Sequence, residues 1–269
     1  MEKLQKYFLS VILLFLAVSC NTKEEQVKKI YDYGFHYYQG STQHMNAFAY
    51  ALELDPSKAE TYRELSVTYL KRGIPHKWNS WYKDAIKYDA ETWQPWRGYL
   101  YLWFYRDYKK AIADFDASDT LTPNFTDQPQ GHSVDYWRGI AYLGLKDYKN
   151  SILYFDTYIN QEIEESGEDW VEVTAFLYRG IANFEAGNFE EAMLNFNKQL
   201  QYSRNFSADA KYYKALILKE QGDFKNAKTI INEAIEDFNA GYYNNRPYVE
   251  TLRQIYLEDL ENLKAGLQQ

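Results

Sequence analysis

The chain contains a single cysteine, Cys20, among its 269 residues. One cysteine cannot form an internal disulfide, so no disulfide framework stabilises this fold. The four histidines never form a His-Glu-x-x-His motif, and the sequence lacks both a phosphate-binding glycine loop and a Gly-x-Ser-x-Gly elbow. We therefore expect no catalytic residues, no cofactor and no metal site.

Apolar residues run uninterrupted from Tyr7 to Val18 except at Ser10, which is too short a stretch to span a bilayer. Lys3 and Lys6 precede this run, and Ser19-Cys20 follow it. A short basic region followed by an apolar core and small residues is typical of a signal peptide. We expect residues 1–19 to be this peptide.

The end of this segment, Leu16-Ala17-Val18-Ser19-Cys20, resembles the lipobox of bacterial lipoproteins. It departs from that motif in having Ala17 three places before the cysteine, where leucine is usual. The resemblance implies cleavage before Cys20, lipid attachment to Cys20, and a short tether over residues 20–26.

The residue after the cysteine is Asn21 rather than the aspartate that resembles an inner-membrane retention signal. This favours the outer membrane and leaves open whether the chain lies on the periplasmic face or the cell surface. The net charge of −8 argues against nucleic acid as a partner and against electrostatic docking on anionic lipid. Membrane attachment is therefore expected through the lipid on Cys20.

Three similar blocks, Trp96-Arg97-Gly98, Trp137-Arg138-Gly139 and Tyr178-Arg179-Gly180, follow one another at intervals of 41 residues. A fixed period of this size indicates a stacked repeat protein. Small residues recur in similar settings at Gly34, Ser66, Gly98, Gly139, Gly180 and Ala215. Each is followed 14 to 17 places later by a large apolar residue, namely Phe48, Tyr82, Phe115, Phe155, Phe196 and Ile231. The pattern predicts helix pairs that cross closely at the small residue, with the large residue packed beside it.

The segment from Tyr178 through Gly187-Asn188-Phe189 to Phe196 resembles a tetratricopeptide repeat (TPR), and so does Ala51 to Pro56. The resemblance covers about six units over residues 27–238. It implies an all-α fold, a right-handed superhelix of helix-turn-helix units. After a turn at Tyr242 to Pro247, Val249, Leu252, Tyr256, Leu260 and Leu263 recur at helical spacing. This spacing predicts a capping helix within residues 239–269.

Two features depart from the regular repeat. Trp78 stands where most units have a small residue, so we expect the second helix pair to be splayed or shifted. At two junctions, 119–135 and 160–172, the repeat interval of 41 residues exceeds the usual 34 by 7 residues. They represent either binding insertions or, alternatively, slack loops or longer helices. The second is rich in acids, and a solvated acidic turn is favoured there over a Ca²⁺ site.

The repeated Arg97, Arg138 and Arg179 admit two interpretations. They could form a ladder of guanidinium groups for a ligand carboxylate. Alternatively, each could pack on aromatic rings and pair with a helix acid such as Asp114 or Asp156. We favour the second interpretation because the arginines recur with the scaffold.

Aromatic residues make up 18% of the chain and are the stronger functional lead. The TPR resemblance implies that the first helix of each pair lines a groove. The residues expected to face it are Tyr31, Phe35, Tyr38, Arg63, Tyr99, Trp103, Tyr136, Phe184 and Tyr212. Tyrosine and tryptophan provide rigid, half-polar contact area of the kind found in binding hot spots. The alternative is that these residues cover neighbouring helices.

These features together favour a lipid-anchored adaptor that binds another envelope protein or peptide segment, without catalysis. A glycan-binding outer-membrane lipoprotein is the alternative, because aromatic platforms also stack on sugars.

Overall fold

The structure is a computed structural model that describes residues 22–267. The predicted signal peptide and Cys20 lie outside the described residues. Within 22–267 the chain forms thirteen α-helices and no β-strand, which confirms the expected all-α class. None of the described helices is both long and apolar enough to cross a membrane.

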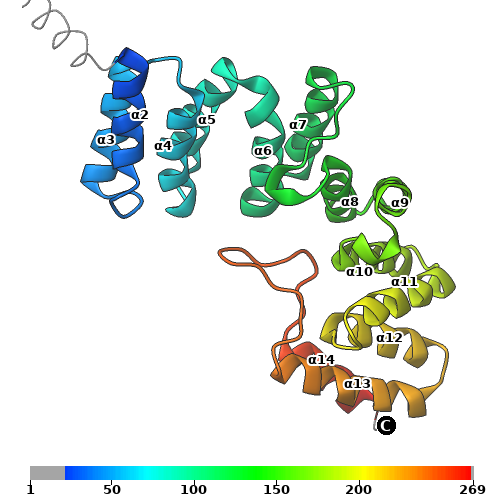
Figure 1. The fold of residues 1–269 in the computed structure, drawn as a ribbon. Coiled ribbons are helices and arrows are strands. Elements are labelled where there is room, and N and C mark those ends of the chain that lie inside the picture. Colours follow the sequence, from blue (N-terminus) through cyan, green and yellow to red (C-terminus); the bar gives the residue numbers. More distant parts are fainter. Residues whose placement is uncertain (1–21, 268–269) are drawn as a thin grey trace, which may run out of the picture. The chain divides into compact units, whose positions relative to one another are not determined.

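The helices belong to two compact units, which divide between Trp93 and Gln94, inside α6 (Ala90–Leu100). The first unit holds two helix pairs (Figure 1): α2 (Lys23–Gly34) with α3 (Thr42–Leu54), and α4 (Ala59–Lys71) with α5 (Pro75–Tyr88). In the second unit α6 continues as the π-helix η1 (Tyr101–Tyr105) and is followed by α7 (Tyr108–Leu121), α8 (Val134–Gly144), α9 (Tyr148–Glu165), α10 (Val173–Glu185), α11 (Phe189–Tyr202), α12 (Ala208–Glu220), α13 (Phe224–Asn239) and α14 (Leu257–Gly266).

Close crossings within the helix pairs occur where the repeat pattern predicts them. A Cβ atom added to Gly98 or Gly180 would lie 2.6 Å from the ring of Phe115 or Phe196, in the second helix of the same pair. The glycines at 34 and 139 meet Phe48 and Phe155 at 2.9 Å and 2.8 Å in the same way. The missing side chain therefore makes room for a buried phenylalanine, which locks the two helices together.

Turns within the pairs use left-handed backbone followed by a helix N-cap. Gly222 has φ +80°, and the next residue, Asp223, accepts a hydrogen bond from the Asn226 N–H at 3.2 Å. Where glycine is lacking, Arg106 and Lys146 adopt φ 53° and 61° before the caps of α7 and α9. The left-handed residue is thus the shared element of these turns, because Ile74 before α5 and Asn188 before α11 make no side-chain cap yet follow Gly73 and Gly187 at φ 65° and 83°.

The first helix begins earlier than the predicted tether allows. Lys23 to Gln26 lie in α2, so the helix includes most of the segment assigned to the tether. Thr22 and Glu25 exchange backbone-to-side-chain hydrogen bonds of 3.1 Å and 3.0 Å. This reciprocal capping box satisfies backbone donors that would otherwise be unpaired and stabilises the helix start.

The expectation that Trp78 splays the second pair is wrong. Trp78 is buried and packs against Tyr82, with the ring centroids 5.7 Å apart, and α4 and α5 remain packed along one another. Ser66 on α4 is also fully buried, so the pair keeps a packed interior despite the large indole.

The two long junctions are built differently. Residues 122–133 form a loop that contains a short 3-10 turn, η2 (Pro129–Gly131). The second junction is largely helix, because α9 has 18 residues where α7 and α11 have 14, and a 3-10 turn, η3 (Glu168–Trp170), completes it. The longer-helix interpretation thus holds for the second junction only.

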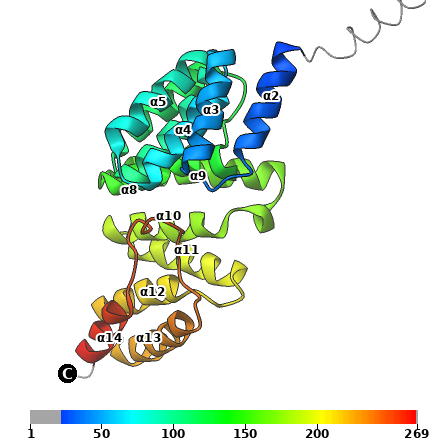
Figure 2. The same cartoon turned by 90° about the vertical axis from the view of Figure 1, so that its left-hand side faces the viewer.

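The predicted C-terminal helix is shorter than expected, because residues 242–256 form an irregular segment and α14 begins at Leu257. Pro247 lacks a backbone N–H, and Tyr248 and Arg253 have φ 72° and 57°, which an α-helix cannot accommodate. Leu260 and Leu263 are buried as predicted, against the last helix pair. Figures 1 and 2 both show the irregular segment extending away from α13 and α14 towards α10. We call residues 242–256 the C-terminal strap.

Candidate functional site

In the first unit, the predicted groove residues gather near the turn between α2 and α3. Tyr31 and Phe35 each pack edge-on against Phe48 with ring centroids 5.2 Å apart. Burial raises the pKa of Tyr31 to about 12, so its hydroxyl stays neutral at physiological pH. Phe35 is 53% exposed and Tyr38 is 93% exposed, so these two side chains present an accessible aromatic surface.

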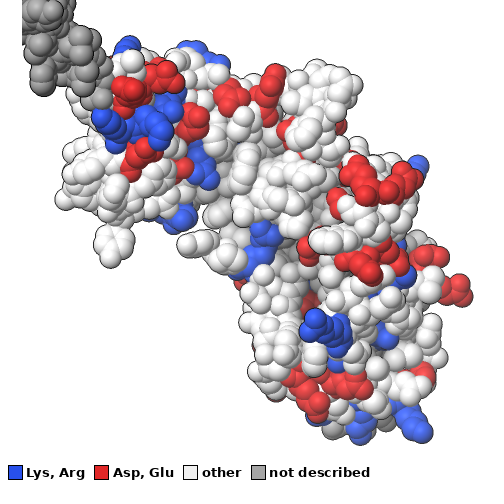
Figure 3. Space-filling model, in the orientation of Figure 1, with Lys and Arg blue, Asp and Glu red and all other residues white. Residues whose placement is uncertain are grey.

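A pocket of about 510 Å³ lies at this turn and is lined by Phe35, His36, Tyr37, Tyr38, Ser41 and Gln43. None of these six side chains is acidic or carries a lysine or arginine charge. Figure 3 shows that this end of the first unit is largely uncharged surface, whereas charged side chains gather at the opposite end of α2. We call these six residues the aromatic turn pocket.

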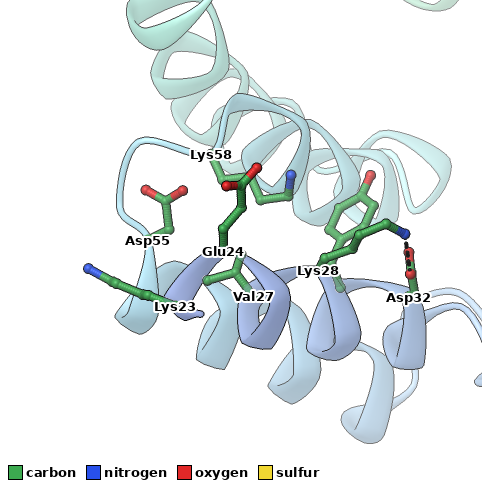
Figure 4. A pocket seen from close by; sticks show the side chains of 8 residues that line it. Lys23, Glu24, Val27, Lys28, Asp32, Asp55 and Lys58 are labelled. Carbon is green, nitrogen blue, oxygen red and sulfur yellow. Dashed lines mark hydrogen bonds and ion pairs between the residues drawn. The ribbon is translucent and has the colours of Figure 1, made fainter. Parts of the chain in front are cut away.

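The charged end of the first unit holds a larger pocket of about 660 Å³ (Figure 4). Its charged lining residues are Lys23, Glu24, Lys28, Asp32, Asp55 and Lys58. Lys28 and Asp32 already pair at 2.7 Å. With three lysines and three acids, the charges of the lining residues balance.

Arg63, also predicted to face the groove, is engaged by its own neighbours. Its guanidinium pairs with Glu64 and lies 5.7 Å from the ring of Trp93. These contacts use the charge within the first unit, so Arg63 is a scaffold residue here.

In the second unit the predicted residues Tyr99, Trp103 and Tyr136 are brought together but are not open to solvent. All three are buried, and Tyr99 and Trp103 both pack edge-on against Trp137, with centroids 5.2 Å and 6.0 Å apart. Tyr136 hydrogen-bonds to Thr174 at 2.7 Å, and burial raises its pKa well above the usual value. The expectation that these side chains form an open groove is therefore wrong in this structure.

The C-terminal strap covers these aromatic residues. The Arg246 guanidinium lies 4.4 Å from the Trp103 ring centroid and donates a 2.5 Å hydrogen bond to the Tyr99 hydroxyl. Asn244 donates from its side-chain amide to the Tyr178 hydroxyl at 2.9 Å. The Arg246 guanidinium also lies 5.5 Å from the Trp137 ring centroid in α8, so the strap contacts the first helices of three successive pairs.

Further bonds hold the ends of the strap. The Asn244 N–H donates to a buried carboxylate oxygen of Asp209 at 2.7 Å. Arg253 donates two hydrogen bonds to Glu185, and Arg106 donates to the backbone carbonyls of Glu250 and Thr251. The sequence pattern missed these contacts, because the partners lie 35 to 145 residues apart. The turn-forming run before Pro247 was the available signal, but it does not indicate what the strap covers.

The last two predicted groove residues, Phe184 and Tyr212, are half-buried. Both pack edge-on against Tyr213, with ring centroids 5.3 Å and 5.4 Å apart. Tyr212 also packs on the apolar cluster around α12 and α13. They cover neighbouring helices, which is the alternative that the sequence left open.

The repeated arginines pair within the scaffold, as the favoured interpretation predicts. Arg97 donates two hydrogen bonds to Asp114, at 2.7 Å and 2.8 Å. Arg179 bonds to Asp156 and Asn195. Arg138 is 2% exposed and pairs with the carboxylates of residues 116, 119 and 135. No arginine of this series is free to form a ligand ladder.

Comparison with known proteins agrees with this architecture. A family model for the tetratricopeptide repeat matches residues 208–236, which span α12 and most of α13. No curated protein sequence matches the chain significantly.

Solved structures with the same fold include several repeat proteins of low sequence identity. The type IV pilus biogenesis factor PilW superposes with a TM-score of 0.62 at 15% identity, over 82% of this chain and 96% of that one. Pseudomonas aeruginosa PilF gives 0.59 at 16% identity, over 81% and 99%. YrrB, a TPR protein with an unusual peptide-binding site, gives 0.53 at 18% identity, over 72% and 93%. The family model thus matches one tetratricopeptide repeat at residues 208–236, and the solved structures, like the glycine–phenylalanine crossings, show that the chain has the helix-pair fold of such repeat proteins.

Proposed function

We propose that this chain is a membrane-anchored adaptor of the cell envelope that binds another protein and performs no catalysis. The aromatic turn pocket carries the proposal. Most large aromatic side chains of the repeats are packed against helices, but Phe35 and Tyr38 are exposed beside a cavity without charged walls. Burying such rings against a partner supplies binding free energy and leaves no buried charge unpaired.

The anchor in this proposal is the lipid on Cys20, as the lipobox resemblance implies. The described helices begin at Lys23, so few residues separate the lipid from the fold. Three residues of extended chain reach only about 10 Å. The first helix pair would therefore lie close to the membrane surface, and its partner would be a membrane-bound or membrane-proximal protein. Outer-membrane location is part of the same proposal and rests on Asn21.

Site-specific photo-crosslinking in intact cells tests the partner site. A photo-crosslinking phenylalanine derivative replaces Tyr38, and the same derivative at Tyr50 serves as the control, because Tyr50 is also exposed but lies in α3 outside the pocket. We expect discrete protein adducts from position 38 that are absent from position 50. Equal labelling at both positions would reject a specific protein site.

A separate titration distinguishes the glycan-binding alternative from the adaptor. Phe35→Ser and Tyr38→Ser variants are titrated with envelope polysaccharides and monitored by tryptophan fluorescence. The adaptor proposal expects no response from the wild-type chain. A saturable response lost in both variants, together with the absence of protein adducts, would favour the glycan-binding function instead.

A further inference from the structure

Three aromatic rings of the second unit surround one arginine side chain. The Arg246 guanidinium carbon lies 4.4 Å from the ring centroid of Trp103, 5.5 Å from that of Trp137 and 5.6 Å from that of Tyr99. The rings come from α6, η1 and α8, and all three are buried. We call Tyr99, Trp103 and Trp137 the aromatic cage. Ring faces attract a cation most strongly when water is excluded around them.

Arg246 differs from the scaffold arginines in having no acidic partner. Arg97, Arg138 and Arg179 each bond to at least one carboxylate, whereas no ion pair forms at Arg246 among residues 22–267. Its bond to the Tyr99 hydroxyl and its three ring contacts are the interactions that hold the guanidinium. The cage therefore recognises a planar cation by its aromatic faces.

Two buried hydrogen-bond donors at the cage have no acceptor while Arg246 occupies it. Trp103 Nε1 and Arg106 Nη1 are both buried and have no hydrogen-bond acceptor within the described part of the chain. Arg106 uses its other terminal nitrogen to donate to the strap carbonyls of Glu250 and Thr251. Both donors adjoin the cage, since the Arg106 guanidinium lies 5.7 Å from the Trp103 ring centroid. Leaving buried donors unpaired disfavours the present state, and acceptors brought by a bound peptide would relieve that cost.

The strap backbone next to Arg246 also adopts an unfavourable conformation. Tyr248 has φ 72°, a left-handed conformation that is unfavourable for a bulky residue, and its side chain is 75% exposed. Its neighbours Asn245 and Pro247 are exposed as well. Of residues 245–248 only Arg246 is partly buried, so this part of the strap meets the cage through Arg246.

From these observations we propose that the aromatic cage is a binding site for an arginine-bearing extended peptide segment. In the present structure the chain's own Arg246 fills this site, and a partner segment with the same chemistry binds by replacing it. The strap then acts as an internal competitor. This site uses residues distinct from the aromatic turn pocket and stands independently of the lipid anchor.

The test uses the chain's own strap as a probe, a fluorescent synthetic peptide covering residues 241–252. Binding to the full chain is measured by anisotropy for the wild type and for Arg246→Ala. We expect Arg246→Ala to bind the peptide at least about tenfold more tightly, because the internal competitor has been removed. A peptide with alanine in place of its arginine should not bind, and one with lysine should bind more weakly.

Two control variants make the result specific. Arg204→Ala removes an exposed arginine outside the strap and should bind like the wild type. Trp103→Ala combined with Arg246→Ala should abolish binding. Equal affinity of the peptide for wild type and Arg246→Ala, or equal binding of the arginine and alanine peptides, would overturn the proposal.

A second measurement needs no variant and therefore does not depend on variant folding. Hydrogen exchange of the wild-type chain is followed with and without excess peptide. Displacement of the strap predicts faster exchange over residues 244–250 when the peptide is present. Unchanged exchange at saturating peptide would count against displacement, whatever the state of the partner site at Tyr38.

Discussion

Arg138 is the most deeply buried of the repeated arginines, and its environment differs from that of Arg179. Arg138 faces three carboxylates, of which that of Asp135 is largely shielded from water. Asp156, the partner of Arg179, is half-exposed. Removing a buried cation leaves a buried carboxylate uncompensated, whereas an exposed carboxylate regains its hydration.

We therefore expect Arg138→Ala to lower the free energy of unfolding by about 3–5 kcal/mol. Arg179→Ala should cost only about 1 kcal/mol. Urea denaturation of both variants measures the difference. Equal losses would mean that burial of the carboxylate does not control the effect.

A second prediction concerns Gly180, the glycine at the crossing of α10 and α11. Gly180→Ala would place a methyl group 2.6 Å from the Phe196 ring, so the pair must separate or the ring must shift. We expect a loss of about 1–3 kcal/mol in the free energy of unfolding. Combining it with Phe196→Leu should cost less than the sum of the two single changes, since the smaller side chain makes room.

Gly266→Ala is the matched control, because its added methyl group would find its nearest neighbour, Lys219 Nζ, at 3.8 Å. This variant should be neutral or slightly stabilising. Additive losses in the Gly180/Phe196 pair would contradict the close-crossing explanation.

At the scale of elements, the strap and α12 are joined through a buried acid. Burial raises the pKa of the Asp209 carboxyl to about 7, although the Asn244 N–H that donates to it partly opposes the shift. The folded chain therefore takes up a proton near pH 7, whereas the unfolded chain does so only near pH 4. Between these values the contribution of Asp209 to stability falls as pH rises, by about 1.4 kcal/mol per pH unit.

Asp209→Asn keeps an oxygen acceptor for Asn244 and removes the charge. We expect the variant to melt at a higher temperature than wild type at pH 8 and to lose that advantage at pH 5. Thermal melts at the two pH values test whether the difference in melting temperature grows with pH. An advantage that is constant with pH would show that Asp209 does not titrate in this window.

At the scale of the whole molecule, the proposed anchor predicts where the chain is found. Cys20→Ser removes the only thiol that could carry lipid. We expect the wild-type chain in the membrane fraction and the variant in the soluble fraction, since a covalent acyl chain contributes about 0.8 kcal/mol per buried CH₂. Intact mass should show a lipid adduct that begins at Cys20. Membrane retention of the variant would point to another anchor.

The sequence alone predicted the local, repeated part of the molecule. Gly98 and Phe115 are close along the chain and belong to one helix pair, as do Gly180 and Phe196. Their contact could therefore be predicted from their spacing in the sequence. The pairing of the repeated arginines with acids could be predicted for the same reason, because Arg97 and Asp114 occupy fixed places in the repeat. Short-range periodicity constrains such contacts directly.

Tertiary structure decided which aromatic residues remain accessible. Tyr38 and Trp103 were equivalent candidates in the repeat pattern, yet one is 93% exposed and the other 2%. Trp103 is covered by Trp137, by Arg106 and by Arg246, which lies more than 140 residues further along the chain. Arg246 reaches the cage because Pro247 and the left-handed Tyr248 interrupt the helical pattern. A contact between such distant residues depends on how the helix pairs stack, and residue spacing carries no information about it.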